Sequence, residues 1–144
     1  SYDGPFSKRC TGSSCSLLGA SGESTLKPTC ERVEVFEGFF DFLSWLVIKD
    51  ITKPFADICV LNSVNNIDRG MEFILAHRDI SAWTDCDQAG YKALDTLRAR
   101  CTDVRDHLSE MAGCNDVNEL LLQRSSQKNV IPSNIQNNSL TIKK

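Results

Sequence analysis

The most regular alternation of apolar and polar positions lies between residues 84 and 113. Its apolar members recur three and four positions apart, as they do on one face of an α-helix. They are Leu94, Leu97, Cys101, Val104, Leu108 and Met111. Thr84 or Asp85 offers a capping side chain at the start, and Gly113 suits the position just after a helix end. The pattern predicts one long helix between these residues.

A second run with helical spacing covers residues 52–78. Thr52 stands two positions before Pro54, and proline is tolerated in the first turn of a helix, where its missing N–H would have no partner. Apolar residues then recur at intervals of four, three, four and three; they are Val60, Val64, Ile67, Met71 and Ile74. We expect one helix to about residue 78, bent near 62–66, where helix formers are poor.

Residues 29–49 predict a helix that is apolar on almost every side. Thr29 can cap it, and the stretch from Phe39 to Ile48 is interrupted by Asp41 and Ser44 alone. A helix that is apolar all round is usually surrounded by others. A short fourth helix is expected after Asn115; its apolar residues are Val117, Leu120, Leu121 and Leu122.

These patterns predict an all-α fold in a single domain, a disulfide-stapled bundle of about four helices over residues 29–123. Residues 1–28 are rich in Gly, Ser, Thr and Pro and are expected to form an irregular N-terminal strap held by cysteines. Residues 124–144 are polar and are expected to be a flexible tail. Its charged residues are all basic: Arg124, Lys128, Lys143 and Lys144.

Composition and charge narrow the class of protein. Apolar residues make up 41% of the 144 residues and charged residues 24%, which is ordinary for a globular domain. A net charge of −3 does not suggest a nucleic-acid surface, so we expect no nucleic-acid partner. The basic tail is interpreted as solvated, with recruitment of an acidic partner as the alternative. The longest apolar stretch is about half of what a bilayer crossing needs, so no transmembrane segment is expected.

The seven cysteines predict a disulfide framework and an oxidising, extracellular compartment. They are Cys10, Cys15, Cys30, Cys59, Cys86, Cys101 and Cys114. Bundle geometry favours Cys30 with Cys86 and Cys59 with Cys101. Cys114 would then pair with Cys10 or Cys15, and a local bridge between Cys10 and Cys15 is the alternative. Because the chain begins with Ser1 rather than Met, we expect a removed secretory signal.

An odd number of cysteines leaves one thiol unpaired or bonded to another chain. A disulfide-linked homodimer or heterodimer is one outcome, and a thiol buried as a small apolar group is the other. The closest cysteines are separated by four residues, which does not fit the paired ligands of a zinc site. We therefore expect no metal.

No catalytic or cofactor-binding motif is found on spacing. His77 and Asp79 stand two apart, so on a helix they would point away from each other, and His107 stands among charged residues. Both histidines are expected to be surface groups. The segment from Gly19 to Ser24 lacks the ending of a phosphate-binding loop. A glycosylation acceptor begins at Asn137, a weak signal.

Aromatic residues supply the candidate binding sites. Phe39, Phe42 and Trp45 could line a pocket for a hydrophobic ligand, although burial among neighbouring helices is the favoured interpretation. Trp83 is expected in the loop between two helices, where an exposed tryptophan would anchor a protein interface.

The sequence alone therefore favours a secreted, non-enzymatic binding or effector protein that engages a macromolecular partner, a protein, through a rigid helical scaffold. The first alternative is an extracellular carrier of small hydrophobic ligands. The second is a small secreted hydrolase that uses His77. No cofactor is expected in the favoured case.

Overall fold

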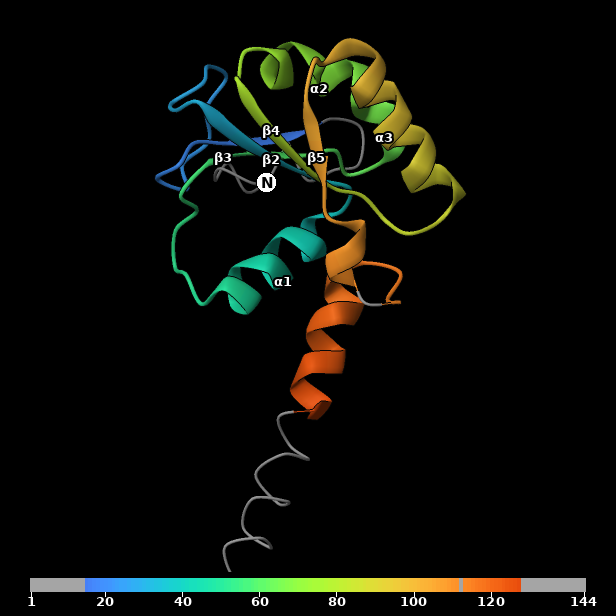
Figure 1. The fold of residues 1–144 in the computed structure, drawn as a ribbon. Coiled ribbons are helices and arrows are strands. Elements are labelled where there is room, and N and C mark those ends of the chain that lie inside the picture. Colours follow the sequence, from blue (N-terminus) through green and yellow to red (C-terminus); the bar gives the residue numbers. More distant parts are fainter. Residues whose placement is uncertain (1–14, 112, 128–144) are drawn as a thin grey trace, which may run out of the picture.

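The computed structural model describes residues 15–111 and 113–127, and over these residues the chain folds around one five-stranded sheet with helices on both faces (Figure 1). The strands lie in the order β1-β3-β2-β4-β5. Their bounds are β1 (Ser16–Leu18), β2 (Arg32–Phe36), β3 (Asp57–Val60), β4 (Asp79–Trp83) and β5 (Val104–Asp106). The edge strand β1 is antiparallel to β3, and all other pairs are parallel. The predicted all-α bundle is therefore wrong: the fold is α/β.

Helices cover the sheet on two sides. Their bounds are α1 (Phe39–Lys49), α2 (Ile67–Leu75), α3 (Gln88–Arg100) and a helix over 117–127, with short 3-10 turns η1 (Val64–Asn66) and η2 (Leu108–Met111). In Figure 1, α2 and α3 lie over one face, and α1 and helix 117–127 lie on the other. Two hydrophobic cores result, one on each side of the sheet. Helix 117–127 occupies the place where the sequence predicts a short fourth helix.

Each of the three long predicted helices contains a strand and a helix. Residues 29–49 form β2 and α1, residues 52–78 form β3, η1 and α2, and residues 85–113 form α3, β5 and η2. The strands are short and buried on both faces, so they appear in the sequence as brief apolar runs rather than as an alternating pattern. In β2, for example, Val33 and Val35 pack into the core beneath α2 and α3, while Phe36 packs on the α1 side.

Local backbone features fix the ends of the helices. Gly38 precedes α1 in an extended conformation, and Asp50 ends α1 in the left-handed region with φ 56°. Asp87, rather than the predicted Thr84 or Asp85, caps α3 by accepting a hydrogen bond from the backbone N–H of Gly90 at 2.8 Å. Cys101 leaves α3 in an extended conformation, so the apolar spacing that continues to Met111 crosses a strand.

The connections on the two sides of β2 run in opposite directions. From β2 the chain crosses through α1 to β3 on one side, and from β4 it crosses through α3 to β5 on the other. Such a reversal opens a crevice between the carboxyl ends of the two central strands, and in open α/β sheets ligands bind there. The carboxyl ends of β2 and β4 are therefore the place to look for a site.

The described cysteines are free thiols, so the predicted disulfide staple is wrong. Among residues 15–111 and 113–127, the free thiols are those of Cys15, Cys30, Cys59, Cys86, Cys101 and Cys114. Most of them are buried as small apolar groups on the sheet and its helices. Cys10, most of the predicted strap and the tail beyond residue 127 lie outside the described residues.

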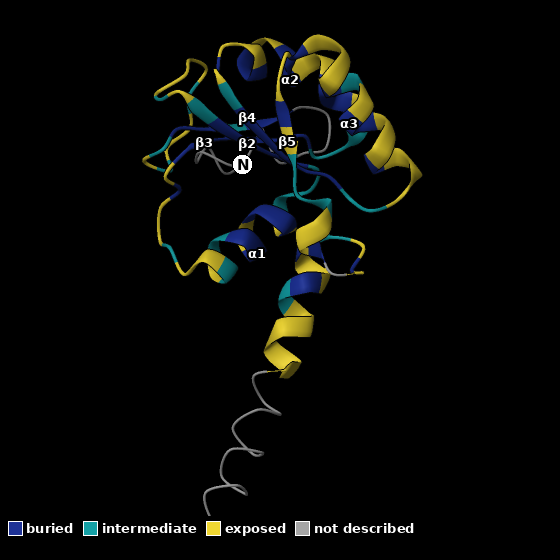
Figure 2. Ribbon diagram, in the orientation of Figure 1, coloured by how far each residue is buried: buried dark blue, intermediate teal, exposed yellow. Residues whose placement is uncertain are grey.

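Burial follows the layers of the fold. Figure 2 shows the buried residues concentrated in the strands and on the inner sides of the helices, while the outer sides of α2 and α3 are exposed. None of the helices within the described ranges is long and apolar enough to cross a membrane. The cores stabilise the sheet mainly through buried apolar area.

Candidate metal centre at the carboxyl ends of two strands

Three carboxylates directly follow the two central strands. Glu37 is the first residue after β2, and Asp85 and Asp87 come two and four residues after β4. Because β2 and β4 are parallel neighbours, their carboxyl ends meet at one edge of the sheet. The backbone N–H of Asp85 donates a hydrogen bond to Oε2 of Glu37 at 2.8 Å. The loop after β4 is thus held against the end of β2.

A fourth carboxylate comes from the first turn of α1. Asp41 is 7% exposed, and its Oδ1 accepts a hydrogen bond from the backbone N–H of Asn118 at 3.2 Å. The Ser44 hydroxyl donates to Oδ1 of Asn118 at 3.0 Å, so one face of α1 is tied to helix 117–127. Gly38 permits this arrangement, since a Cβ there would lie 3.3 Å from Oδ2 of Asp41.

Asp116 supplies a fifth carboxylate from the segment before helix 117–127. The backbone N–H of Cys86 donates to the carbonyl of Asn115 at 2.6 Å, which attaches this segment to the loop after β4. Asp116 also caps its own helix by accepting from the backbone N–H of Glu119 at 2.7 Å. One ligand oxygen from each of Asp41, Asp85 and Asp116 lies within 4.8 Å of the others. Three segments distant in sequence therefore converge on one point.

Gly90 allows the first turn of α3 to pack directly on the loop that carries Asp85. A Cβ at position 90 would lie 1.9 Å from the carbonyl oxygen of Asp85, a distance that no side chain tolerates. The backbone N–H of Gly90 also donates the hydrogen bond to Oδ1 of Asp87 by which Asp87 caps α3. Glycine at this position therefore fixes where both aspartates of the loop stand.

Burial, and after it the crowding of like charges, raises the pKa of three of these carboxyl groups. Burial, followed by the charges of Glu37, Asp41, Asp116 and Asp87, raises the pKa of Asp85 to about 8. Burial is also the main reason why the pKa of Asp41 rises to about 6. The pKa of Glu37 is raised as well, chiefly by burial. Bringing these groups together is therefore unfavourable unless protons or a cation balance their charge.

The donor set fits a hard divalent cation. Every ligand atom in the cluster is a carboxylate oxygen, which Mg²⁺ and Ca²⁺ prefer. Oδ1 of Asp85 is buried and accepts no hydrogen bond from any described residue, and a buried acceptor without a partner is costly. A cation bound between Asp41, Asp85 and Asp116 would satisfy this oxygen and offset the repulsion.

The aromatic residues singled out from the sequence lie elsewhere. Trp83 belongs to β4, is 4% exposed, and donates its indole N–H to Oε1 of Glu34 at 2.7 Å. It is therefore not in a loop between helices. Phe42 and Trp45 pack against Phe36 in the core on the α1 side, with ring centroids 5.6 and 5.4 Å away.

Phe39 is partly buried against the same core, at the edge nearer the site. Phe39, Phe42 and Trp45 therefore pack in this core, whereas Phe40 of the same helix is exposed.

The two histidines are also not the surface groups that were expected. His77 is buried; its Nε2 lies 2.7 Å from Oδ2 of Asp57 and its Nδ1 lies 2.8 Å from the carbonyl of Phe73. This pair stands at the amino-terminal ends of the strands, since Asp57 begins β3. His107 stacks on Trp83, with ring centroids 3.8 Å apart.

The fold and the site together define an α/β domain with a cluster of carboxylates at the switch point of a mostly parallel sheet, where a metal ion could bind. The sequence model of the Toprim-like family matches residues 34–121, more than half of the chain. The protein belongs to this family. Comparisons with curated proteins and with solved structures give no significant match.

Family membership corrects the functional predictions made from the sequence alone. Toprim-like domains are typically catalytic domains for metal-dependent nucleotidyl transfer or nuclease cleavage, and they act on nucleic acids. The expected non-enzymatic effector, with a protein or a small hydrophobic ligand as partner and no nucleic acid, is therefore wrong. The net charge of −3 is a poor guide because it averages over the chain, whereas a cation held by the carboxylates would reverse the charge that a phosphate meets.

Sequence reasoning missed all five carboxylates, although a local signal was present. Asp85 and Asp87 flank Cys86 directly after the apolar run of β4, and Gly90 follows three residues later. Asp85 is predicted to be a helix cap because the residues before it, which form β4, are predicted to form a loop. Glu37 and Gly38 likewise follow the apolar run of β2, as the first and second residues after it. No sequence signal points to Asp116, whose place depends on the tertiary fold.

Proposed function

We propose that this chain is the catalytic domain of a metal-dependent enzyme that makes or breaks phosphodiester bonds in nucleic acid. The observation that supports this most is the convergence of Asp41, Asp85 and Asp116 within 4.8 Å, beside Glu37 and Asp87, at the switch point of a Toprim-like domain. The prediction of an extracellular location was argued from disulfides; it is not part of this proposal because the described thiols are free.

The residues divide into holding and positioning roles. Asp41, Asp85 and Asp116 would hold the cation, with Asp87 at the open side, where it is exposed. When bound, a divalent cation at such a site neutralises developing charge on a phosphate and orients the reacting oxygens. Gly90 and the Asp85 N–H bond to Glu37 keep the loop in place before substrate arrives.

Glu37 is the candidate for proton transfer. Its pKa is raised chiefly by burial, although the bond from the Asp85 N–H opposes this. A carboxyl group with a raised pKa exchanges protons more readily near neutral pH than an ordinary glutamate does. We assign to Glu37 the proton that enters or leaves at the attacking or leaving oxygen.

The test is metal-dependent turnover of nucleic acid. Labelled single-stranded and duplex oligonucleotides and supercoiled plasmid are incubated with Mg²⁺ or Mn²⁺, with and without nucleoside triphosphates, so that cleavage and transfer are both detected. We expect activity that EDTA abolishes. Asp87→Asn should lower it by at least about a hundredfold.

Asp95→Asn is the matched control, since Asp95 is also an exposed aspartate of the α3 region but lies away from the cluster. Activity that persists in EDTA, or that Asp87→Asn and Asp95→Asn affect equally, would contradict the proposal.

A further inference from the structure

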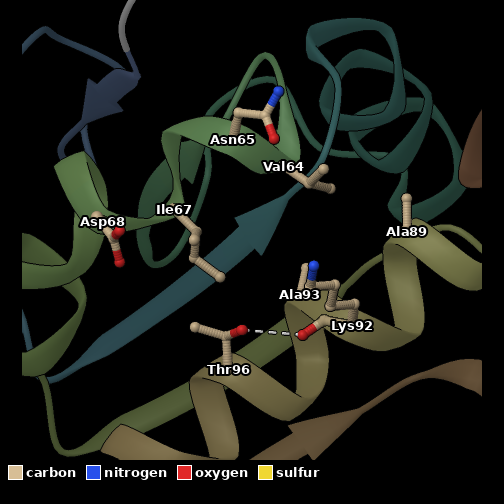
Figure 3. Close-up of a pocket in the computed structure, with 8 residues that line it drawn as sticks. All are labelled: Val64, Asn65, Ile67, Asp68, Ala89, Lys92, Ala93 and Thr96. Carbon is tan, nitrogen blue, oxygen red and sulfur yellow. Dashed lines mark hydrogen bonds between the residues drawn. The ribbon is translucent and has the colours of Figure 1, made fainter.

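A groove lies between α3 and the segment that joins β3 to α2. It has a volume of about 410 Å³ and is open to solvent on one side. It is lined by Val64, Asn65, Ile67, Asp68, Ala89, Lys92, Ala93 and Thr96. Figure 3 shows the residues of η1 and α2 on one wall and those of α3 on the other.

The groove continues along the first turn of α3 toward the loop after β4. A second cavity, of about 510 Å³, is lined by Asp87, Gln88, Ala89 and Lys92, and shares Ala89 and Lys92 with the first. Asp87, one of its lining residues, belongs to the loop that carries Asp85. A molecule held at the carboxylates can therefore extend along the first turn of α3 into the groove.

The lining combines apolar walls with one cation. Val64, Ile67 and Ala93 present aliphatic surface, which suits the face of a planar ring. Of the described residues that line the two cavities, Lys92 alone is cationic, and its side chain is exposed at their shared boundary. Asn65 adds an amide to the lining and Asp68 a carboxylate, and both residues are exposed.

We infer that this groove binds one nucleotide of a single-stranded nucleic acid, next to the phosphate held at the carboxylate cluster. The base lies against Val64 and Ala93, and Lys92 contacts the phosphate that follows along the chain. This inference rests on the proposed function, which it deepens by naming the form of the substrate.

Two arguments favour this occupant. The carboxyl groups of Asp41, Asp85 and Asp116 converge at the site, so a polyanion needs a cation beyond the metal on its path, and Lys92 lines the cavity that leads toward them. A base inside a groove between two helical segments is unstacked and unpaired, which a continuous duplex does not allow without flipping. The groove therefore selects a single strand or a frayed end.

The experiment measures the affinity of labelled oligo(dT) and oligo(U) by fluorescence anisotropy, in Ca²⁺ to limit turnover. Ala89→Phe fills the groove from its rim, and Lys92→Ala removes the cation. Ala99→Phe and Lys53→Ala are matched controls at exposed positions away from the groove. Mn²⁺ binding and thermal melting are measured on every protein.

We expect Ala89→Phe to weaken binding about tenfold and Lys92→Ala about fivefold, with both controls within about twofold of the parent. Lys92→Ala should also reduce the dependence of log Kd on log salt by about 0.7, the value for one phosphate of a single strand. A blunt duplex should compete at least about tenfold less well than the single strand. The two oligonucleotide arms report whether DNA or RNA is preferred.

Equal affinities of the parent and both groove variants, or a preference for blunt duplex, would overturn the groove assignment. Failure of the proposed function has a different signature, because the parent would then bind no Mn²⁺. If the groove variants melt like the parent but lose oligonucleotide binding, the groove assignment is supported, whether or not the parent binds Mn²⁺.

Discussion

Oε2 of Glu37 accepts the backbone N–H of Asp85 at 2.8 Å, and this one bond joins the carboxyl ends of β2 and β4. It brings two acidic residues together, although burial and then the charge of Glu37 raise the pKa of Asp85. The arrangement is stable because the sheet and the turn at Gly90 hold both loops in place. A cation bound at the cluster would offset the remaining repulsion.

Metal affinity should depend steeply on pH. The pKa of Asp85 is raised to about 8, so at pH 6 a cation must displace the proton of this carboxyl group. We expect the Mn²⁺ affinity of the parent to rise by about tenfold per pH unit between pH 6 and pH 8. Isothermal titration calorimetry in buffers of different ionisation enthalpy measures the released proton. A pH-independent affinity with no proton release would contradict this assignment.

Stability without metal should change in the opposite sense. The folded pKa of Asp85 lies above its unfolded value of about 3.9, so the folded state binds more protons than the unfolded state in this window. The free energy of unfolding in EDTA should therefore fall as the pH rises from 5 to 8. Urea denaturation at the two pH values measures the slope. Asp85→Asn should flatten it and Asp95→Asn should not.

Gly90→Ala should damage both stability and the site. The added methyl group meets the carbonyl oxygen of Asp85 at 1.9 Å, so either α3 or the loop after β4 must move. Overpacking of this kind costs about 1–3 kcal/mol. We expect a lower urea midpoint together with weaker Mn²⁺ binding. Gln88→Ala, at an exposed position of the same turn, is the control. If the Gly90→Ala protein were as stable as the Gln88→Ala protein, the close packing of Gly90 on Asp85 would be contradicted.

The buried pair of Asp57 and His77 should determine stability in acid. Burial raises the pKa of Asp57, but hydrogen bonds from Thr29 and His77 outweigh it and leave the pKa below its ordinary value. Its contribution is therefore present above about pH 3.9, the unfolded value, and is lost as the pH falls through the lower folded pKa.

Asp57→Asn should lower the free energy of unfolding at pH 7 by about 3–5 kcal/mol, because it leaves a buried imidazole without its charged partner. The deficit should shrink at pH 3. Urea denaturation of the parent and Asp57→Asn at both pH values measures it, with Asp68→Asn as an exposed control. An equal deficit at the two pH values would show that Asp57 stabilises the fold without its charge.

The thiols should be free in the native protein. The six described cysteines form no disulfide, so protein purified without reductant should give at least six reactive thiols per chain once unfolded in guanidinium. Dithiothreitol should leave the melting temperature unchanged. A fall in melting temperature on reduction would restore the disulfide framework that the sequence suggested.

The sequence located apolar faces better than it located strands. Leu94 and Leu97 do form the buried side of a helix, and Val117 and Leu120 that of another. Val104 continues the three-and-four spacing by coincidence, since it belongs to β5. Strands of four or five residues that are buried on both faces, such as β2, β3 and β4, give no alternation, and their apolar runs resemble helix segments of the same length.

The site was predictable in part. Asp85 and Asp87 after an apolar run, with Gly90 following, are visible in the sequence once β4 is recognised as a strand. The convergence of Asp41 and Asp116 is not, because it depends on how α1 and helix 117–127 pack on each other. The number of cysteines favours disulfides. The structure instead buries most of the described thiols, which pack as small apolar groups.

Carboxylates from three segments of the chain are proposed to form a divalent cation site. Titration with Mn²⁺ at pH 8, followed by electron paramagnetic resonance, tests this most directly. We predict a saturable site in the parent that Asp116→Asn weakens at least about tenfold, while the exposed Asp103→Asn binds as the parent does. A parent that binds no Mn²⁺, or an Asp116→Asn protein with unchanged affinity, would contradict the account.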